Sequence, residues 1–267
     1  ETAANGNIII NKGSVFADGG QISISGTSSG KEIPLAYADN MAFEGYGKIS
    51  ISNASDIDVS GESSGEIKIQ GNELNIEKSF INSYTRSENG GRIDIQLKGD
   101  MKVSNEAQIA TVAQGMGNAG DIVLNLEKLE ITGRGMVFSN SQANGKSGDI
   151  LVNAHDSVSI SGNLSMLSTN AFKKGDAGNV AITTDILSLN HNGAISAKAH
   201  EEGGTGGNIS IAAGNITVTN NSEINTSSEK GKSGNITLAV NHLAVSGNGK
   251  ISTGEKKASS GNIDIIS

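Results

Sequence analysis

One short motif recurs along most of the chain and limits what the chain can fold into. It is a glycine followed, two and four residues later, by Ile, Val or Leu, as in SGNITL and SGNIDI. From residue 65 onward its glycines recur every 26 to 30 residues, at Gly65, Gly91, Gly120, Gly148, Gly178, Gly207, Gly234 and Gly261. Self-similarity at a fixed period of this length is typical of a solenoid, in which each repeat packs on its neighbours.

Each repeat contains three short apolar stretches. In the repeat that begins at Gly234, the first stretch is Ile236 and Leu238, the second is Leu243 and Val245, and the third is a single residue, Ile251. Apolar residues at positions i and i+2 lie on the same face of a strand. No part of the chain keeps a helical period, so the sequence predicts an all-β fold with almost no helix.

Three strands per repeat predict a parallel β-helix, or β-solenoid, with about 27–30 residues per coil and roughly eight to nine coils. Successive coils would stack about 4.8 Å apart, with Ile on Ile and Leu on Leu. We expect glycine at the corners because it adopts positive φ without steric cost, and asparagine as the next best residue there. One outward slot reads Asn179, Asn208, Asn235 and Asn262, which would form an amide ladder or simply provide good corner residues. We favour the second interpretation.

Composition excludes several classes of protein. The formal net charge is −8 and there is no basic tract, which argues against binding to nucleic acid. Cysteine is absent, so the chain has neither a disulfide framework nor a thiolate metal site. No run of 18 apolar residues predicts a membrane-spanning helix. Aromatic residues make up only 3 %, so the core must be built from smaller apolar side chains.

The repeat is interrupted once, between Gly20 and Gly65, by an excess that lies in residues 26–46. We therefore predict a single β-helix domain over residues 1–267, with an extra-helical insertion at 26–46. This insertion contains Tyr37, Phe43 and Tyr46, which makes these three aromatic residues the candidate ligand-binding residues. The alternative is that the insertion packs its own aromatics against the coil wall or caps the rod.

The sequence offers little for catalysis or metal binding. The outward carboxylates of the first strands occur singly, at Glu66, Asp94, Asp121, Asp149 and Asp264. Asp121 and Asp149 would stack in neighbouring coils, but general acid–base catalysis needs two carboxyls whose environments separate their pKa values. We interpret them as a solvated pair. The four histidines share no slot, and zinc needs at least three convergent ligands. We therefore expect no catalytic residue, no metal and no cofactor.

The repeat pattern resembles that of filamentous-haemagglutinin-type exoproteins. The likeness is clearest over residues 176–211, DAGNVAITTDILSLNHNGAISAKAHEEGGTGGNISI, and weaker versions extend from about residue 5 onward. The resemblance implies a right-handed parallel β-helix, export through an outer-membrane transporter of two-partner secretion, and a place outside the cell or on its outer surface. It also implies roles in adhesion, biofilm and virulence. The NPNG-type motif of that family's secretion domain does not occur here. We therefore expect a segment of a longer exoprotein or a processed filament subunit.

Three functions fit these observations. The first is a non-enzymatic, extracellular structural and adhesive β-solenoid whose receptor is a glycan or protein of a host, a cell surface or a matrix. The second is a filament or matrix subunit that associates with its own copies end to end or laterally, as unprotected strand edges favour. The third is a β-helix that binds or degrades a polysaccharide.

Overall fold

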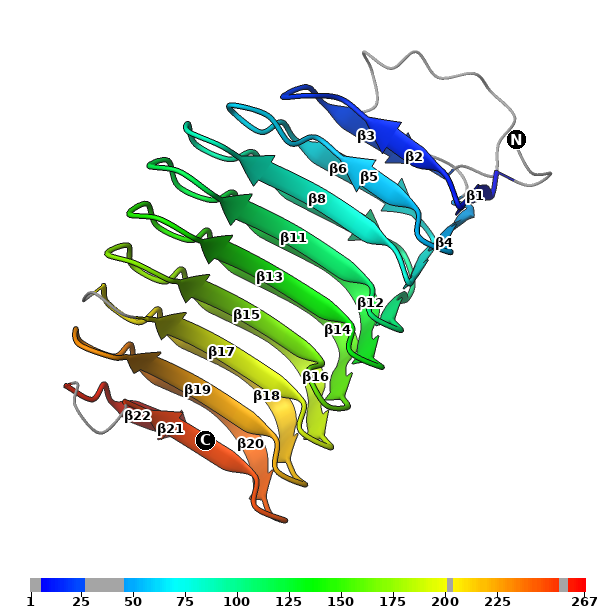
Figure 1. Ribbon diagram of the computed structural model, residues 1–267. Coiled ribbons are helices and arrows are strands. Elements are labelled where there is room, and N and C mark those ends of the chain that lie inside the picture. Colours follow the sequence, from blue (N-terminus) through cyan, green and yellow to red (C-terminus); the bar gives the residue numbers. More distant parts are fainter. Residues whose placement is uncertain (1–5, 27–45, 201–203, 255–258) are drawn as a thin grey trace.

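The computed structural model describes residues 6–26, 46–200, 204–254 and 259–267 (Figure 1). Over these residues the chain winds into a β-solenoid of about 8 turns, with parallel strands and no helix. The predicted fold class is therefore confirmed, and the chain is a β-helix repeat protein. Within the same residues no helix is long and apolar enough to cross a lipid bilayer.

Two parallel sheets run along the solenoid. Sheet A collects the first and second strands of the coils, and sheet B collects the third strands. The strands of sheet A are β1 (Ile8–Asn11), β3 (Ile22–Ser25), β4 (Lys48–Ser52), β6 (Ile67–Gly71), β7 (Glu73–Glu77), β9 (Ile93–Leu97), β10 (Met101–Ser104), β12 (Ile122–Thr132), β14 (Ile150–Ser161), β16 (Val180–Asn190), β18 (Ile209–Val218), β20 (Ile236–Val245) and β22 (Ile263–Ile266). The strands of sheet B are β2 (Ser14–Phe16), β5 (Asp56–Asp58), β8 (Phe80–Thr85), β11 (Gln108–Ala113), β13 (Met136–Ser141), β15 (Met166–Ala171), β17 (Ala194–Ala199), β19 (Glu223–Ser228) and β21 (Lys250–Thr253).

The first two strand segments of a coil are separate near the N-terminus and continuous later. β6 and β7 are distinct, as are β9 and β10, whereas β12 spans both segments without a break. The pairing of β12 with β14 shifts register between Leu126 and Lys128. A register shift of this kind bends a strand, so it marks the corner between the two segments.

The predicted apolar ladders form the core. Ile69 pairs with Ile95 of the next coil, and Ile95 aligns in turn with Leu124; all three side chains are fully buried. Each such side chain contributes roughly 1.5–3 kcal/mol through burial, before conformational entropy is subtracted. The solenoid is therefore stabilised by one continuous apolar column shared between neighbouring coils.

The repeat glycines have a different role from the one predicted. None of those from Gly65 to Gly261 has a positive φ, so the prediction based on positive φ is wrong for them. Each of these glycines instead lies against the backbone of the coil before it: a Cβ on Gly120 would lie 1.8 Å from the carbonyl oxygen of Gly91. Positive φ occurs at other corners, where Asn105 and Asn220 adopt it as expected for asparagine.

The outward asparagine slot forms an amide ladder, contrary to the interpretation favoured from the sequence. The backbone N–H of Asn208 donates to Asn179 Oδ1 at 3.0 Å, and the N–H of Asn235 donates to Asn208 Oδ1 at 2.9 Å. Asp149 continues the same ladder, because it accepts from the N–H of Asn179 at 2.7 Å. The column thus ties each coil to the next through a side-chain oxygen.

Candidate functional site

The predicted insertion leaves and rejoins the solenoid at one point. The backbone N–H of Gly47 donates to the carbonyl oxygen of Gly26 at 3.0 Å. Of the three candidate aromatics, Tyr37 and Phe43 lie outside the described residues. Tyr46 lies at the point of return, with Lys98 Nζ 5.8 Å from the centroid of its ring. This distance is within the range of a cation–π contact, so Tyr46 is held against the coil wall.

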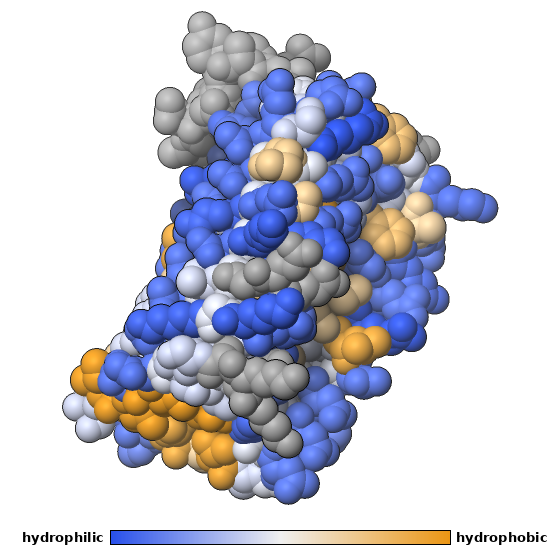
Figure 2. All heavy atoms as spheres, turned by 60° about the vertical axis from the view of Figure 1, so that its left-hand side comes forward, coloured by the Kyte–Doolittle hydropathy of each residue, from blue (hydrophilic) through white to orange (hydrophobic). Residues whose placement is uncertain are grey.

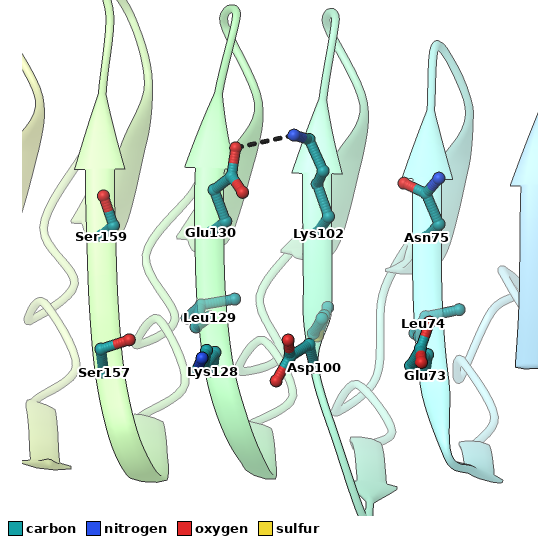
Figure 3. A pocket seen from close by; sticks show the side chains of 11 residues that line it. Glu73, Leu74, Asn75, Asp100, Lys102, Lys128, Leu129, Glu130, Ser157 and Ser159 are labelled. Carbon is teal, nitrogen blue, oxygen red and sulfur yellow. Dashed lines mark hydrogen bonds and ion pairs between the residues drawn. The ribbon is translucent and has the colours of Figure 1, made fainter.

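A polar groove of about 380 Å³ crosses sheet A beside this point, over strands β7, β10, β12 and β14 (Figure 3). Its volume is in the range of small-ligand sites. The residues that line it are Glu73, Leu74, Asn75, Asp100, Met101, Lys102, Lys128, Leu129, Glu130, Ser157 and Ser159. Most of these residues are polar or charged and none is aromatic, so the groove offers ionic and hydrogen-bonding contacts beside aliphatic ones.

The charged groups of this groove neutralise one another between coils. Lys102 Nζ lies 2.7 Å from Glu130 Oε1, and Figure 3 shows the two side chains meeting across adjacent strands. Lys128 Nζ lies 3.2 Å from Asp156 Oδ2. The hydrogen bond to Asp156, followed by the charges of Asp156 and Asp100, raises the pKa of Lys128. Such exposed pairs are screened by solvent and add little to the stability of the fold, and they leave little net charge to attract a ligand.

The other titratable residues singled out from the sequence do not converge. Asp149 donates its backbone N–H to Asp121 Oδ1 at 2.8 Å, so this pair belongs to the ladder that links the coils. His200 Nδ1 lies 3.4 Å from Glu229 Oε1, and its ring stacks on Phe172 with centroids 5.1 Å apart. Among the described residues no group of three or more His, Cys, Asp or Glu side chains could hold a metal ion.

A surface that the sequence analysis missed lies on the outward side of sheet B. We call it the aromatic face, and it consists of Phe80 and Tyr84 on β8, Ala110 and Val112 on β11, and Met136 and Phe138 on β13. These residues alternate with the buried inward residues of the same strands, so they point away from the core. The four larger side chains remain partly exposed.

The small residues of β11 show how closely this face is packed. Ala110 and Val112 point outward, yet they are only 0 % and 3 % exposed. Larger side chains on the flanking strands β8 and β13 must therefore lean over them. Burial, followed by the charges of Asp58 and Asp56, raises the pKa of Tyr84, whose side chain is partly exposed.

The sequence carried a signal for the aromatic face. In FINSYT (residues 80–85) and MVFSNS (136–141), large apolar residues occupy the positions that alternate with the inward ones. The repeat motif contains only one inward apolar residue in each third strand, so the motif alone does not indicate this second, outward alternation. In Figure 2 hydrophobic side chains stand out as separate spots along the right-hand side, on an otherwise hydrophilic surface.

Comparison with protein-family profiles finds no match, and neither a curated protein nor a solved structure is significantly similar to the chain.

Proposed function

We propose that the chain is a non-enzymatic, extracellular structural and adhesive β-solenoid segment of a bacterial surface or secreted exoprotein of the filamentous-haemagglutinin type. The observation that supports it most directly is the aromatic face. Its side chains lie outside the apolar core, so they contribute to packing only locally while leaving large apolar groups in contact with water. A contact surface for another macromolecule accounts for this arrangement, since aromatic residues are enriched at binding surfaces.

The stacking of the coils supports the structural part of this proposal. Each coil packs on its two neighbours through the core ladders and the asparagine ladder, so a solenoid can fold progressively from one end. The chain has no cysteine and requires no oxidation step for this. Such a chain suits export through an outer-membrane pore of two-partner secretion, which we propose as its route.

The adhesive role is tested by displaying the chain on beads and measuring their attachment to a glycan array, to matrix proteins and to cell surfaces. We expect attachment that falls in the Phe138→Ala and Tyr84→Ala variants. The matched control is Ile186→Ala, because Ile186 is 45 % exposed but lies on sheet A. Circular dichroism establishes that all variants keep their strands. Equal attachment by the three variants would overturn the proposal, and release of reducing ends from a polysaccharide panel would overturn its non-enzymatic part.

A further inference from the structure

We infer that the aromatic face of sheet B is a binding site for neutral glycan chains; this inference rests on the adhesive function proposed above and names its ligand class. The polar groove of sheet A is not part of this site.

The aromatic side chains are spread over an area suited to an extended ligand. Phe80 and Phe138 lie on strands on either side of β11, so their backbones are about 10 Å apart along the solenoid axis. Tyr84 lies four residues further along β8 than Phe80, which separates their backbones by about 13 Å. The rings therefore bound a surface wider than a single sugar ring. They carry electron-rich faces, which attract the C–H groups on the flat side of a pyranose.

Amide and hydroxyl groups border the rings on the same face. Asn140 and Asn170 are adjacent in the column of Tyr84, and Asn170 Nδ2 donates to Asn140 Oδ1 at 3.1 Å and to Ser168 Oγ at 3.3 Å. A carboxamide has two donor hydrogens and an oxygen with two lone pairs, so both asparagines retain capacity for more hydrogen bonds. Sugar hydroxyls both donate and accept, so they are suitable partners.

The charges around the face favour a neutral ligand. Asp56 and Asp58 lie on β5, directly beside Phe80 and Asn82 of β8. Further along the same face, Lys198 Nζ is already paired with Glu223 Oε1 at 3.1 Å. An anionic glycan would meet two carboxylates at one end of the face and no unpaired cation among these residues, so repulsion would weaken its binding.

The pattern also favours a glycan over an apolar protein surface. Rings and amides alternate across the strands, so a purely apolar partner would bury the amides of Asn140 and Asn170 without offering them hydrogen bonds. Burying a polar group without a hydrogen-bond partner is unfavourable, so such a partner would bind weakly. A glycan offers C–H faces and hydroxyl edges in alternation, and so it satisfies both kinds of group.

The test is calorimetric titration of the full chain with three neutral oligosaccharide probes and one acidic probe. The neutral probes are hexamers of β-linked glucose, xylose and N-acetylglucosamine, and the acidic probe is an oligogalacturonate of equal length. We expect at least one neutral hexamer to bind saturably, with little dependence on salt, and the oligogalacturonate to bind more weakly. Phe138→Ala and Tyr84→Ala are each expected to weaken binding by about tenfold, which corresponds to the loss of one aromatic contact. Ile186→Ala should bind like the wild type.

The outcomes separate this inference from the function on which it rests. If no neutral hexamer binds, or if the acidic probe binds more tightly and loses affinity with salt, the ligand class is wrong. Should bead attachment still depend on Phe138 and Tyr84 in that case, the partner is an acidic glycan where the acidic probe binds, or a protein where no probe binds, and the adhesive function stands. If neither hexamer binding nor bead attachment depends on Phe138 and Tyr84, both proposals are overturned. Thermal unfolding followed by circular dichroism distinguishes a lost contact from a misfolded variant, and a neutral hexamer bound equally by all variants would place the site elsewhere.

Discussion

The glycines Gly91 and Gly120 lie so close between coils that a side chain on Gly120 would meet the carbonyl oxygen of Gly91 at 1.8 Å. The same relationship recurs between Gly120 and Gly148 at 2.1 Å and between Gly148 and Gly178 at 2.0 Å. The obstacle in each case is backbone, which cannot rotate away as a side chain can. The glycine column therefore sets the spacing of the coils at this corner.

Replacing one glycine of this column should be among the most damaging single changes in the chain. We expect Gly120→Ala to lower the free energy of unfolding by at least ~3 kcal/mol, at the upper end of the cost of overpacking. Gly13→Ala is the control, because the atom nearest to a Cβ there is a side-chain methyl group of Ile10 at 3.5 Å. Urea denaturation measures both changes. Equal stabilities for the two variants would contradict the steric role of the column.

The sequence predicted the repeating core well because the core is periodic. Ile69 and Ile95 occupy equivalent positions in successive repeats, and that equivalence alone places them in the same buried column. The reason for the glycines could not be predicted, since the contact between Gly91 and Gly120 depends on how closely two coils approach. A short motif shows that glycine is required at this position. It does not show whether the reason is a positive φ or the lack of room for a Cβ.

The candidate site was predicted less well than the fold. The insertion attracts attention in the sequence because three of the chain's few aromatic residues, Tyr37, Phe43 and Tyr46, cluster there. Phe80 and Phe138 are far apart in sequence and come together only when the register of β8, β11 and β13 is known. Of the predicted site residues, Tyr46 contacts Lys98, and Tyr37 and Phe43 stay predictions.

The asparagine ladder makes a testable contribution to stability. Asn208 accepts from the backbone N–H of Asn235 and donates Nδ2 to Asn179 Oδ1 at 3.2 Å. We expect Asn208→Ala to lower the free energy of unfolding by about 0.5–1.5 kcal/mol for each hydrogen bond lost. Asn208→Asp should retain most of this stability, because Asp149 already accepts from a backbone N–H at the equivalent position. If the alanine and aspartate variants are equally destabilised, the ladder oxygen is not the stabilising group.

A buried hydroxyl column predicts one destabilising and one stabilising change. Thr169 Oγ1 donates to the carbonyl oxygen of Gly178 at 2.6 Å, and Thr226 Oγ1 donates to that of Gly234 at 2.7 Å. Thr169→Val keeps the volume and removes the donor, so it should cost about 1–3 kcal/mol through an unsatisfied buried carbonyl. Between these two threonines the column contains Ala197.

Ala197→Thr should supply the missing donor to the carbonyl oxygen of Gly207. We expect the midpoint of thermal unfolding to rise, with a gain of about 1 kcal/mol, the usual net contribution of a hydrogen bond. Ala197→Val is the control, since it adds volume without a donor. A valine variant as stable as the threonine variant would show that filled space, not the hydrogen bond, determines the effect.

The carboxyl of Asp56 predicts how stability changes in acid. Burial, and then the charge of Asp58, raise its pKa above 3.8, although a hydrogen bond from Asn82 acts in the opposite direction. The folded chain therefore holds this proton more tightly than the unfolded chain. The Asp56 carboxyl therefore adds to the free energy of unfolding at low pH. This contribution is lost as the pH rises from 3.8 through the folded-state pKa. Asp56 remains partly exposed, so screening by solvent keeps the effect small.

Asp56→Asn should remove this pH dependence and make the chain more stable than the wild type at neutral pH. The asparagine oxygen can still accept from Asn82, so the hydrogen bond at 3.1 Å is preserved. Asn82→Ala should act in the opposite sense, because it removes the interaction that lowers the pKa and so widens the pH range over which stability falls. Urea denaturation at a series of pH values on both sides of 3.8 measures all three chains. Parallel pH profiles for the wild type and Asp56→Asn would show that the folded environment does not disfavour the charged carboxylate.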